Sequence, residues 1–248
     1  MSQAGEIAVR VSGLRKSYGS LQALAGVDIE IRRGEVFGLL GPNGSGKTTL
    51  FNVITGYERV DTGEIRFDGR AITGETPARI FGLGIGRTFQ LTRIFPHLTV
   101  LENMHVALPR NIGGLLKHWG SSQEQRQALD LLDFVSLTSL KNEQAGNLSY
   151  GQKKLLEFAL ILVAQPQMIL LDEPAGGVNP TMVNELARGI RTLNRQKNIT
   201  FLVVEHNMEF VMGLCHTVNV MHRGTKIAEG PPQVVRKNPA VLDAYLGV

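Results

Sequence analysis

The chain contains 248 residues, of which 43% are hydrophobic and 19% are charged, and its formal net charge is +4. This balance is ordinary for a globular protein and argues against a disordered or fibrous chain. The basic residues are scattered without a dense arginine–lysine cluster, so the sequence predicts no nucleic-acid partner.

Two further features bear on the cellular setting. A single cysteine, Cys215, excludes an intramolecular disulfide, fits a reducing compartment and is expected to be a small buried filler. The first residues form no apolar stretch of secretory length, and the longest apolar run, residues 158–164, is far shorter than the ~20 residues of a membrane helix. We therefore expect a soluble chain that depends on another protein for any work at a membrane.

The first ninety residues read as strands with two short helices. Strands are indicated where apolar and polar side chains alternate, or where a short apolar run precedes a turn. The helices are indicated by a closing glycine, Gly56, and by a proline at a tolerated first position, Pro77. The expected strands are residues 7–11, 27–31, 35–40 and the first part of 63–70, which ends in a hairpin turn through Asp68–Gly69. The expected helices are residues 48–56 and a short segment from Pro77.

The pattern changes from about residue 91. Thr99 and Glu102 fit a capping box, leucines recur at helical spacing over 122–135, and breakers over 109–122 predict a loop or broken helix. No strand pattern occurs between about 91 and 160, which predicts a helical lobe inserted in an α/β core. Alternating strands and helices then predict a mostly parallel sheet. The expected strands are 168–171 and 200–204, and the expected helices are 181–196 and 207–214.

The stretch GPNGSGKTT at 41–49 matches the P-loop pattern in its required place, after a strand and before a helix. Glycines let consecutive backbone amides curl around phosphate oxygens. Lys47 is expected to reach the β- and γ-phosphates, and the Thr48 hydroxyl to bind Mg²⁺. The predicted phosphate-binding residues are Gly41, Asn43, Gly44, Ser45, Gly46, Lys47, Thr48 and Thr49.

The stretch MILLDE at 168–173 places two carboxylates at the end of an apolar strand. Parallel sheets present ligand-binding residues at that edge. Asp172 is expected to hold Mg²⁺, and Glu173 to orient or deprotonate an attacking water. The sequence therefore predicts hydrolysis of a nucleoside triphosphate.

A second anion site is predicted at LSYGQ, residues 148–152. Ser149 and Gln152 fit a capping box that opens a helix, and Gly151 allows close approach to the backbone. The first amides of a helix lack partners and its dipole is positive there, which favours phosphate.

The order of these motifs resembles the ABC transporter ATPases over essentially the whole chain, with Gln90 closing IGRTFQ and His206 following a later strand. The resemblance implies an α/β fold: a P-loop NTPase (RecA-like) core with an N-terminal antiparallel β subdomain and an inserted helical subdomain. It implies one ABC ATPase domain over 1–248, with residues 1–90 and 161–248 as the nucleotide-binding core and 91–160 as the helical subdomain. ATP and Mg²⁺ are the implied cofactors.

The same resemblance implies a dimer of cassettes packed head to tail, with each ATP between the P-loop of one and the LSYGQ helix start of the other. Ser149 and Gly151 are then expected at the γ-phosphate of a partner's ATP, and Gln152 is expected among the nucleotide-binding residues. Tyr18 resembles the aromatic residue that stacks on adenine. Gln90 resembles the glutamine that reaches Mg²⁺ and the attacking water, and His206 resembles the histidine that contacts the γ-phosphate.

Two positions depart from the family pattern. Tyr150 stands where the commonest version has glycine, and its side chain is expected to point away from the phosphate. Asn179, in EPAGGVNP, stands where an aspartate usually crosses between the two ATP sites. Asparagine keeps the hydrogen-bonding shape and loses the charge.

EPAGGVNP, RTFQ and the closing AYLG resemble an importer subgroup for branched-chain amino acids, amides or urea, and the 109–122 insertion favours its LivG-like ATPase type. The subgroup implies a peripheral protein on the cytoplasmic face of the inner membrane. Its implied partners are permease subunits, a sister ATPase or second copy of this chain, and an extracytoplasmic solute-binding protein. The permease is expected to meet residues 91–98, where Phe95 could instead pack the lobe's own core.

Other classes remain open at this point. They are a lipopolysaccharide-type exporter ATPase, a soluble ABC ATPase of translation or DNA repair, a P-loop kinase and a structural regulator. The single cassette and the lack of sustained heptads argue against the soluble types. A kinase has no use for LSYGQ, and intact Lys47, Asp172 and Glu173 argue against an inactive regulator.

Overall fold

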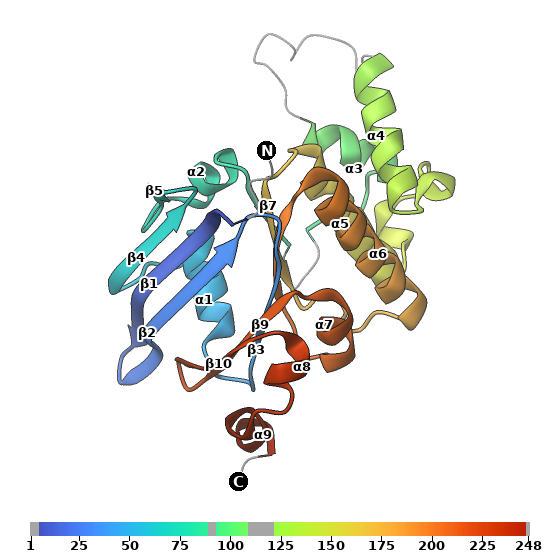
Figure 1. The fold of residues 1–248 in the computed structure, drawn as a ribbon. Coiled ribbons are helices and arrows are strands. Elements are labelled where there is room, and N and C mark those ends of the chain that lie inside the picture. The colour runs from blue at the N-terminus through green and yellow to red at the C-terminus, as the bar shows by residue number, and fades with distance from the viewer. Residues whose placement is uncertain (1–4, 89–92, 109–121, 247–248) are drawn as a thin grey trace.

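The computed structural model describes residues 5–88, 93–108 and 122–246. Two sheets divide these residues (Figure 1). A four-stranded sheet, coloured blue to cyan in Figure 1, lies on one side of the molecule, and helices α3 and α4 lie on the other. The second sheet has six strands and passes between them, so both of its faces are covered.

The four-stranded sheet is antiparallel, with strand order β2-β1-β4-β5. Long strands form here because apolar residues alternate with polar ones and only one face is buried. The hairpin turn predicted at Asp68–Gly69 is confirmed, with φ of +47° and +76° that suit a tight two-residue turn. The strands are β1 (Ile7–Tyr18), β2 (Leu21–Arg32), β4 (Thr62–Phe67) and β5 (Arg70–Ala71).

The six-stranded sheet has the order β10-β9-β3-β8-β7-β6, with only β10 antiparallel to its neighbour. Every residue of β3, β7 and β8 is buried, as expected for strands covered on both faces. The strands are β3 (Val36–Leu40), β6 (Ile85–Arg87), β7 (Met168–Asp172), β8 (Thr200–Val204), β9 (Thr217–His222) and β10 (Thr225–Gly230).

The helices cover both faces of this sheet. Helix α1 lies between the two sheets, whereas α3, α4 and α5 pack on one another at the far side (Figure 1). The bounds are α1 (Lys47–Ile54), α2 (Pro77–Gly82), α3 (Val100–Ala107), α4 (Ser122–Phe134), α5 (Tyr150–Val163), α6 (Pro180–Lys197), α7 (Met208–Leu214), α8 (Pro232–Val235) and α9 (Pro239–Leu246). Two 3₁₀ turns, η2 (Thr138–Leu140) and η3 (Ala145–Asn147), precede α5.

The core consists of two apolar clusters, one on each face of the six-stranded sheet. Leu39 and Val204 belong to the cluster shared with β1, β2, β4 and α1. Leu40 and Val203 belong to the cluster shared with α3–α7. Neighbouring residues of one strand thus point to opposite clusters, and the central strands are held from both sides.

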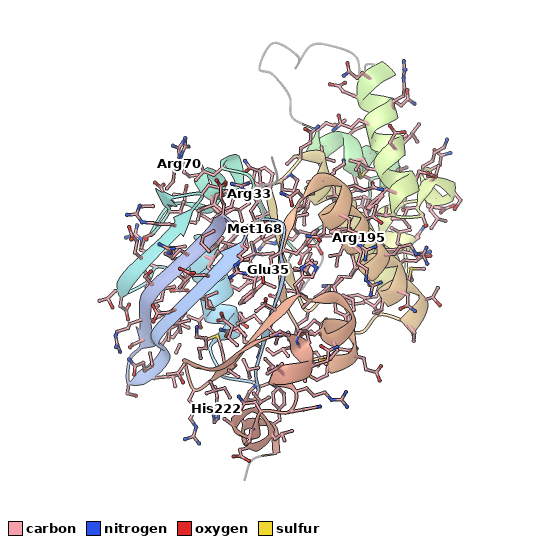
Figure 2. All side chains as sticks on the ribbon, in the orientation of Figure 1. Arg33, Glu35, Arg70, Met168, Arg195 and His222 are labelled. Carbon is pink, nitrogen blue, oxygen red and sulfur yellow. The ribbon has the colours of Figure 1, made fainter. Side chains whose placement is uncertain are left out.

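The parallel strands share a direction that fixes where a site can form. Figure 2 shows Glu35 and Met168 near the middle of the molecule, where β3 and β7 begin, and His222 near α9, where β9 ends. The carboxyl ends of β3, β7 and β8 lie at the same edge as His222, because all four strands are parallel. Ligands of open α/β sheets bind at that edge.

At the C-terminal end of the predicted helical subdomain, helix α5 continues across the expected boundary with the core. Helix α5 runs from Tyr150 to Val163, so the boundary expected between residues 160 and 161 falls inside it. The division of the chain into a nucleotide-binding core of residues 1–90 and 161–248 and a helical subdomain of residues 91–160 stays a prediction. Within the described part of the chain, no helix is long and apolar enough to cross a membrane.

Candidate nucleotide-binding site

Three neighbouring strands bring the predicted catalytic segments level with one another. In β3 and β8, Leu39 pairs with Val204, and in β7 and β8, Asp172 pairs with Val204. The P-loop after β3, the carboxylates at the end of β7 and His206 after β8 therefore emerge side by side. Segments more than 150 residues apart in sequence form one site because the sheet places them in register.

The P-loop has the open backbone that phosphate binding requires. Gly41 has φ of +145° and Gly46 has φ of +101°. A Cβ at Gly41 would overlap the Met221 carbonyl oxygen, and one at Gly46 would overlap the Ala23 carbonyl oxygen. Only glycine fits these two positions, so the loop can wrap closely with its amides free of side-chain obstruction.

The interior of this loop is suited to an anion. The Ser45 hydroxyl oxygen is buried and lacks a hydrogen-bond partner among the described residues. At Gly44, no atom lies within 4 Å of where a Cβ would be. In the same segment, Asn43 and Thr48 are exposed and Thr49 is half-buried. A buried unpaired hydroxyl beside open space fits a phosphate oxygen.

The Lys47 ammonium is turned onto its own loop. Its Nζ donates to the carbonyl oxygens of Gly41 at 2.8 Å and Pro42 at 3.0 Å. Burial lowers the pKa of Lys47, although the charges of Glu173 and Asp172 oppose this shift. These two carbonyl oxygens hold the buried Lys47 ammonium. The negative charge of a phosphate would compensate its positive charge better than neutral carbonyl groups do.

Asp172 is a buried carboxylate whose main chain is anchored to β6. The Thr88 hydroxyl accepts a hydrogen bond from the Asp172 amide at 3.0 Å. Burial raises the pKa of Asp172, and the negative charge of Glu173 raises it further, whereas Arg87, Lys154 and Lys47 oppose the shift. Two adjacent carboxylates in a poorly solvated place favour a cation between them and the phosphates.

Glu173 and His206 face each other across the ends of β7 and β8. Their closest atoms, Glu173 Oε1 and His206 Nδ1, are 3.7 Å apart. The Glu173 side chain is 33% exposed and that of His206 is 62% exposed, so solvent water reaches both. This arrangement suits a base that takes a proton from water beside a group that contacts the same reacting centre.

Tyr18 ends β1 at the tip of the antiparallel sheet, with 45% of its surface exposed. The Lys16 ammonium lies 5.1 Å from the centre of its ring. Strand β2 approaches the P-loop at Ala23, whose carbonyl oxygen lies against Gly46. The hairpin therefore presents an exposed aromatic ring near the phosphate loop.

The LSYGQ stretch begins α5 as predicted. The Ser149 hydroxyl accepts from the Gln152 amide at 3.3 Å, and the Gln152 side-chain oxygen accepts from the Ser149 amide at 2.8 Å. This reciprocal capping box is confirmed, and Ser149 is exposed. Gly151 is buried, and a Cβ there would meet Met182 at 3.1 Å and Val178 at 3.2 Å. The lack of a side chain at Gly151 therefore allows close contact with Met182 and Val178 of the same chain.

A family comparison decides what this set of features represents. Residues 24–176 match the protein-family model described as ABC transporter. Residues 225–248 match a second family model, described as branched-chain amino acid ATP-binding cassette transporter. The first match spans more than half of the chain. The chain belongs to the ABC transporter family.

Individual relatives agree with this ABC membership. The high-affinity branched-chain amino acid transport ATP-binding protein LivG of Salmonella typhimurium is 40% identical over 246 residues, covering 96% of each chain. The crystal structure of the ADP conformation of MJ1267, an ATP-binding cassette of an ABC transporter, superposes with a TM-score of 0.87 at 35% identity, covering 98% of this chain and 100% of that one. The dimeric post-hydrolysis structure of the cassette MJ0796 with ADP and Pi gives 0.78 at 25% identity, covering 90% and 98%.

The two departures from the ABC pattern have local explanations. The Asn179 side-chain oxygen accepts from the Met182 amide at 3.0 Å and caps α6, so it is engaged at the start of a helix. Tyr150 covers Gly177, where a Cβ would lie 3.3 Å from its ring. Its side chain thus packs against the loop after Glu173 in the same chain. Gln90 lies outside the described residues, and its role stays a prediction.

Two residues of this ABC cassette were not singled out from the sequence. Glu205 precedes His206 and is 1% exposed. Arg87 lies between the rings of Phe51 and Tyr57, 4.5 and 4.4 Å from their centres, and donates to Thr55 Oγ1 at 2.7 Å. Glu205 could have been noticed as a charged residue at the end of the apolar run TFLVVE. The contacts of Arg87 come from α1 and the residues after it, so no local sequence pattern indicates them.

Proposed function

We propose that this chain is the ATP-binding and ATP-hydrolysing subunit of an importer for branched-chain amino acids or related small polar solutes. The observation that carries the proposal is the meeting of the P-loop, Asp172 with Glu173, and His206 at one sheet edge. The LivG relatives and the C-terminal family match support the solute class. In this role the protein is peripheral, on the cytoplasmic face of the inner membrane.

The residues divide the work of ATP hydrolysis by their chemistry. The P-loop amides and Lys47 bind the phosphates, for which Lys47 exchanges its contacts with Gly41 and Pro42. Tyr18 stacks on the adenine. Glu173 accepts the proton of the water that attacks the γ-phosphorus, and His206 contacts the γ-phosphate, so that ADP and phosphate are the products.

Thr48 and Asp172 are the residues that would hold Mg²⁺, together with Gln90. Their oxygen atoms are the ligands that Mg²⁺ prefers, and a metal bound mainly to phosphates needs only one or two carboxylates. The described residues contain no group of three acidic, histidine or cysteine side chains that could bind a metal alone, which agrees with a metal completed by the nucleotide. When bound, Mg²⁺ neutralises charge that develops on the phosphate oxygens.

The exposed start of α5 supports a composite site. Ser149 uses its oxygen as an acceptor within the capping box, so its hydroxyl proton is available to a phosphate of a partner cassette. ADP lacks the γ-phosphate, so hydrolysis removes the group that such a second helix end binds. We infer a head-to-tail dimer with a sister chain or a second copy, docked on permease subunits and served by an extracytoplasmic solute-binding protein. Phe95, 54% exposed beside α3, is a candidate for the permease contact.

Hydrolysis is tested with Glu173→Gln, which removes the base and keeps the side-chain shape. ATP binding by calorimetry is expected to remain, whereas single-turnover hydrolysis slows by roughly 10²–10⁴-fold. Glu209→Gln, an exposed carboxylate in the first turn of α7, is the matched control and should leave the rate unchanged. Equal single-turnover rates for Glu173→Gln and the parent chain would remove Glu173 from the role of base.

The dimer and the solute need separate measurements. Light scattering of Glu173→Gln with ATP, alone and with a sister chain, should show a dimer that ADP does not produce. A monomer under all these conditions would contradict the composite site. In proteoliposomes with the permeases and solute-binding protein, leucine, isoleucine or valine should stimulate ATP turnover. Stimulation by urea or a short amide alone would reassign the solute.

A further inference from the structure

Glu205 is a buried carboxylate that has no role in the ATP hydrolysis proposed above. It follows β8, directly before His206, and its side chain has no exposed surface. A carboxylate in such a place is costly unless hydrogen-bond donors surround it. The contacts of its two oxygens therefore indicate what the residue does.

The carboxylate of Glu205 joins the segments that follow two different strands. Its Oε1 accepts a hydrogen bond from the Ala175 amide at 2.7 Å, beyond the end of β7. Its Oε2 accepts from the amides of His206 at 3.0 Å and Asn207 at 3.1 Å, beyond the end of β8. One buried side chain thus fixes the loop after Glu173 to the loop that carries His206.

The backbone at Glu173 needs such a restraint. Its φ of +46° lies in the left-handed region, which is rare and strained for a residue with a side chain. Strained conformations persist where the surroundings over-determine them. On one side of the strain, the Glu173 amide donates to the Val204 carbonyl at 2.9 Å. On the other side, the Ala175 amide is held by Glu205.

We propose that Glu205 is a positioning residue for ATP hydrolysis, which holds the strained Glu173 backbone and the His206 loop as one unit. This inference rests on the proposed function, in which Glu173 is the base. The 3.7 Å approach of Glu173 to His206 is the geometry that the Glu205 carboxylate maintains.

A carboxylate suits this place because both of its terminal atoms can accept hydrogen bonds. It presents acceptors alone, and three amides point at it. A glutamine would direct its NH₂ group at one set of amides, because only one of its two terminal atoms accepts. Glu205→Gln therefore breaks one of the two connections and leaves the volume unchanged.

The test compares steady-state and single-turnover hydrolysis of the full chain and of Glu205→Gln, with its sister chain if dimerisation requires one. We expect kcat to fall by roughly 10–100-fold, as for a small misplacement of a catalytic group, with KM for ATP changed by less than about threefold. Glu229→Gln is the control, since Glu229 Oε2 accepts from Asn219 at 2.9 Å and Lys226 at 3.0 Å in the β9–β10 hairpin. Its kcat should match the parent.

A double-mutant cycle separates positioning from general destabilisation. In a Glu173→Gln background, Glu205→Gln should slow hydrolysis by a smaller factor than in the parent chain, because one of the two groups that it positions, the Glu173 carboxylate, is already absent. A full loss in both backgrounds would overturn the proposal. So would a native kcat in the single variant.

Folding and the underlying function are checked independently. If Glu205→Gln fails to fold, Glu205→Asp keeps the charge and is too short to span both loops, and the same loss of kcat is expected. Failure of both variants to fold would assign Glu205 to the fold and overturn the proposal. Absence of ATP hydrolysis by the parent chain would instead reject the proposed function.

Discussion

The phenolic oxygen of Tyr245 accepts a hydrogen bond from the backbone amide of Gly41 at 2.9 Å. The two residues are 204 positions apart, so the last helix of the chain is tied to the first residue of the P-loop. Burial raises the pKa of Tyr245 and the hydrogen bond from Gly41 opposes this shift, so the hydroxyl is neutral at physiological pH, as in other tyrosines. The C-terminal segment therefore contributes to the phosphate loop from outside the motif itself.

Tyr245→Phe should loosen this tie with little change of shape. The Gly41 amide loses its acceptor, which costs on the order of 1–3 kcal/mol when no water replaces it. We expect Tm to fall by roughly 2–4 °C or more and the ATP dissociation constant to rise about 2–5-fold. Leu242→Ala, on the same helix, is the control that reduces packing and keeps the hydroxyl. A native Tm and a native dissociation constant for Tyr245→Phe would show that the bond contributes nothing.

Lys47 should give nucleotide binding a pH dependence. Its pKa is lowered by burial, so in the free protein it loses its proton below the ordinary range for lysine. Bound phosphates favour the charged form, so the ATP dissociation constant should rise as pH increases through that lowered pKa. Calorimetry between about pH 7 and 10 should show this for the parent chain. Lys47→Ala should bind at least roughly tenfold more weakly, with a flatter profile. Equal affinity at every pH would contradict the assignment.

Asp172→Asn should separate stability from function. The folded pKa of Asp172 is raised above its unfolded value, so at neutral pH the ionised carboxylate opposes folding. Removing the charge should therefore raise Tm by roughly 2–4 °C, as replacements of active-site charges often do. Mg²⁺-dependent ATP hydrolysis should nearly disappear. The gain should begin to shrink as pH falls through the raised pKa and should vanish below the ordinary aspartate pKa, where the parent side chain is neutral in both the folded and the unfolded chain. Scanning calorimetry at neutral and acid pH checks both signs.

Cys215 should be unreactive in the folded protein. It is buried beside Gly38, and burial raises the pKa of its thiol to about 12. The thiolate is the reactive form, and on the order of 10⁻⁵ of the thiol is ionised at pH 7. Maleimide labelling should therefore be at least about 100-fold slower than in urea. Rapid stoichiometric labelling under native conditions would place Cys215 at the surface, against the small buried filler expected from the sequence.

The sequence was most informative where a signal is local. Strands β3, β7 and β8 follow from unbroken apolar runs, and the capping boxes at Thr99 and Ser149 are confirmed with both hydrogen bonds present. The edges of the sheet were missed. β6 has only three residues, and β9 contains fully buried Asn219, whose amide donates to Glu229 at 2.9 Å. A buried asparagine interrupts the apolar pattern that indicates a strand, and its burial is explained only once its hydrogen-bond partner is known.

The site divides in the same way. The P-loop, Asp172 and Glu173 could be predicted as site residues because each lies within a few residues of a diagnostic pattern. Glu205 depends on Ala175, 30 positions away, and Tyr245 depends on Gly41. The sheet and the last helix bring these pairs together, so no spacing in the sequence predicts them.

Helix α5 begins at the exposed Ser149 cap, and only residues 164–167 separate its end from β7, which finishes at Asp172. The helix and the strand thus bring both motifs to the same side of the chain, where Tyr150 packs against Gly177 in the loop after Glu173. In the proposed head-to-tail pair, a displacement of Ser149 when the neighbour's γ-phosphate leaves would be passed through Tyr150 to the loop beside this chain's own Glu173.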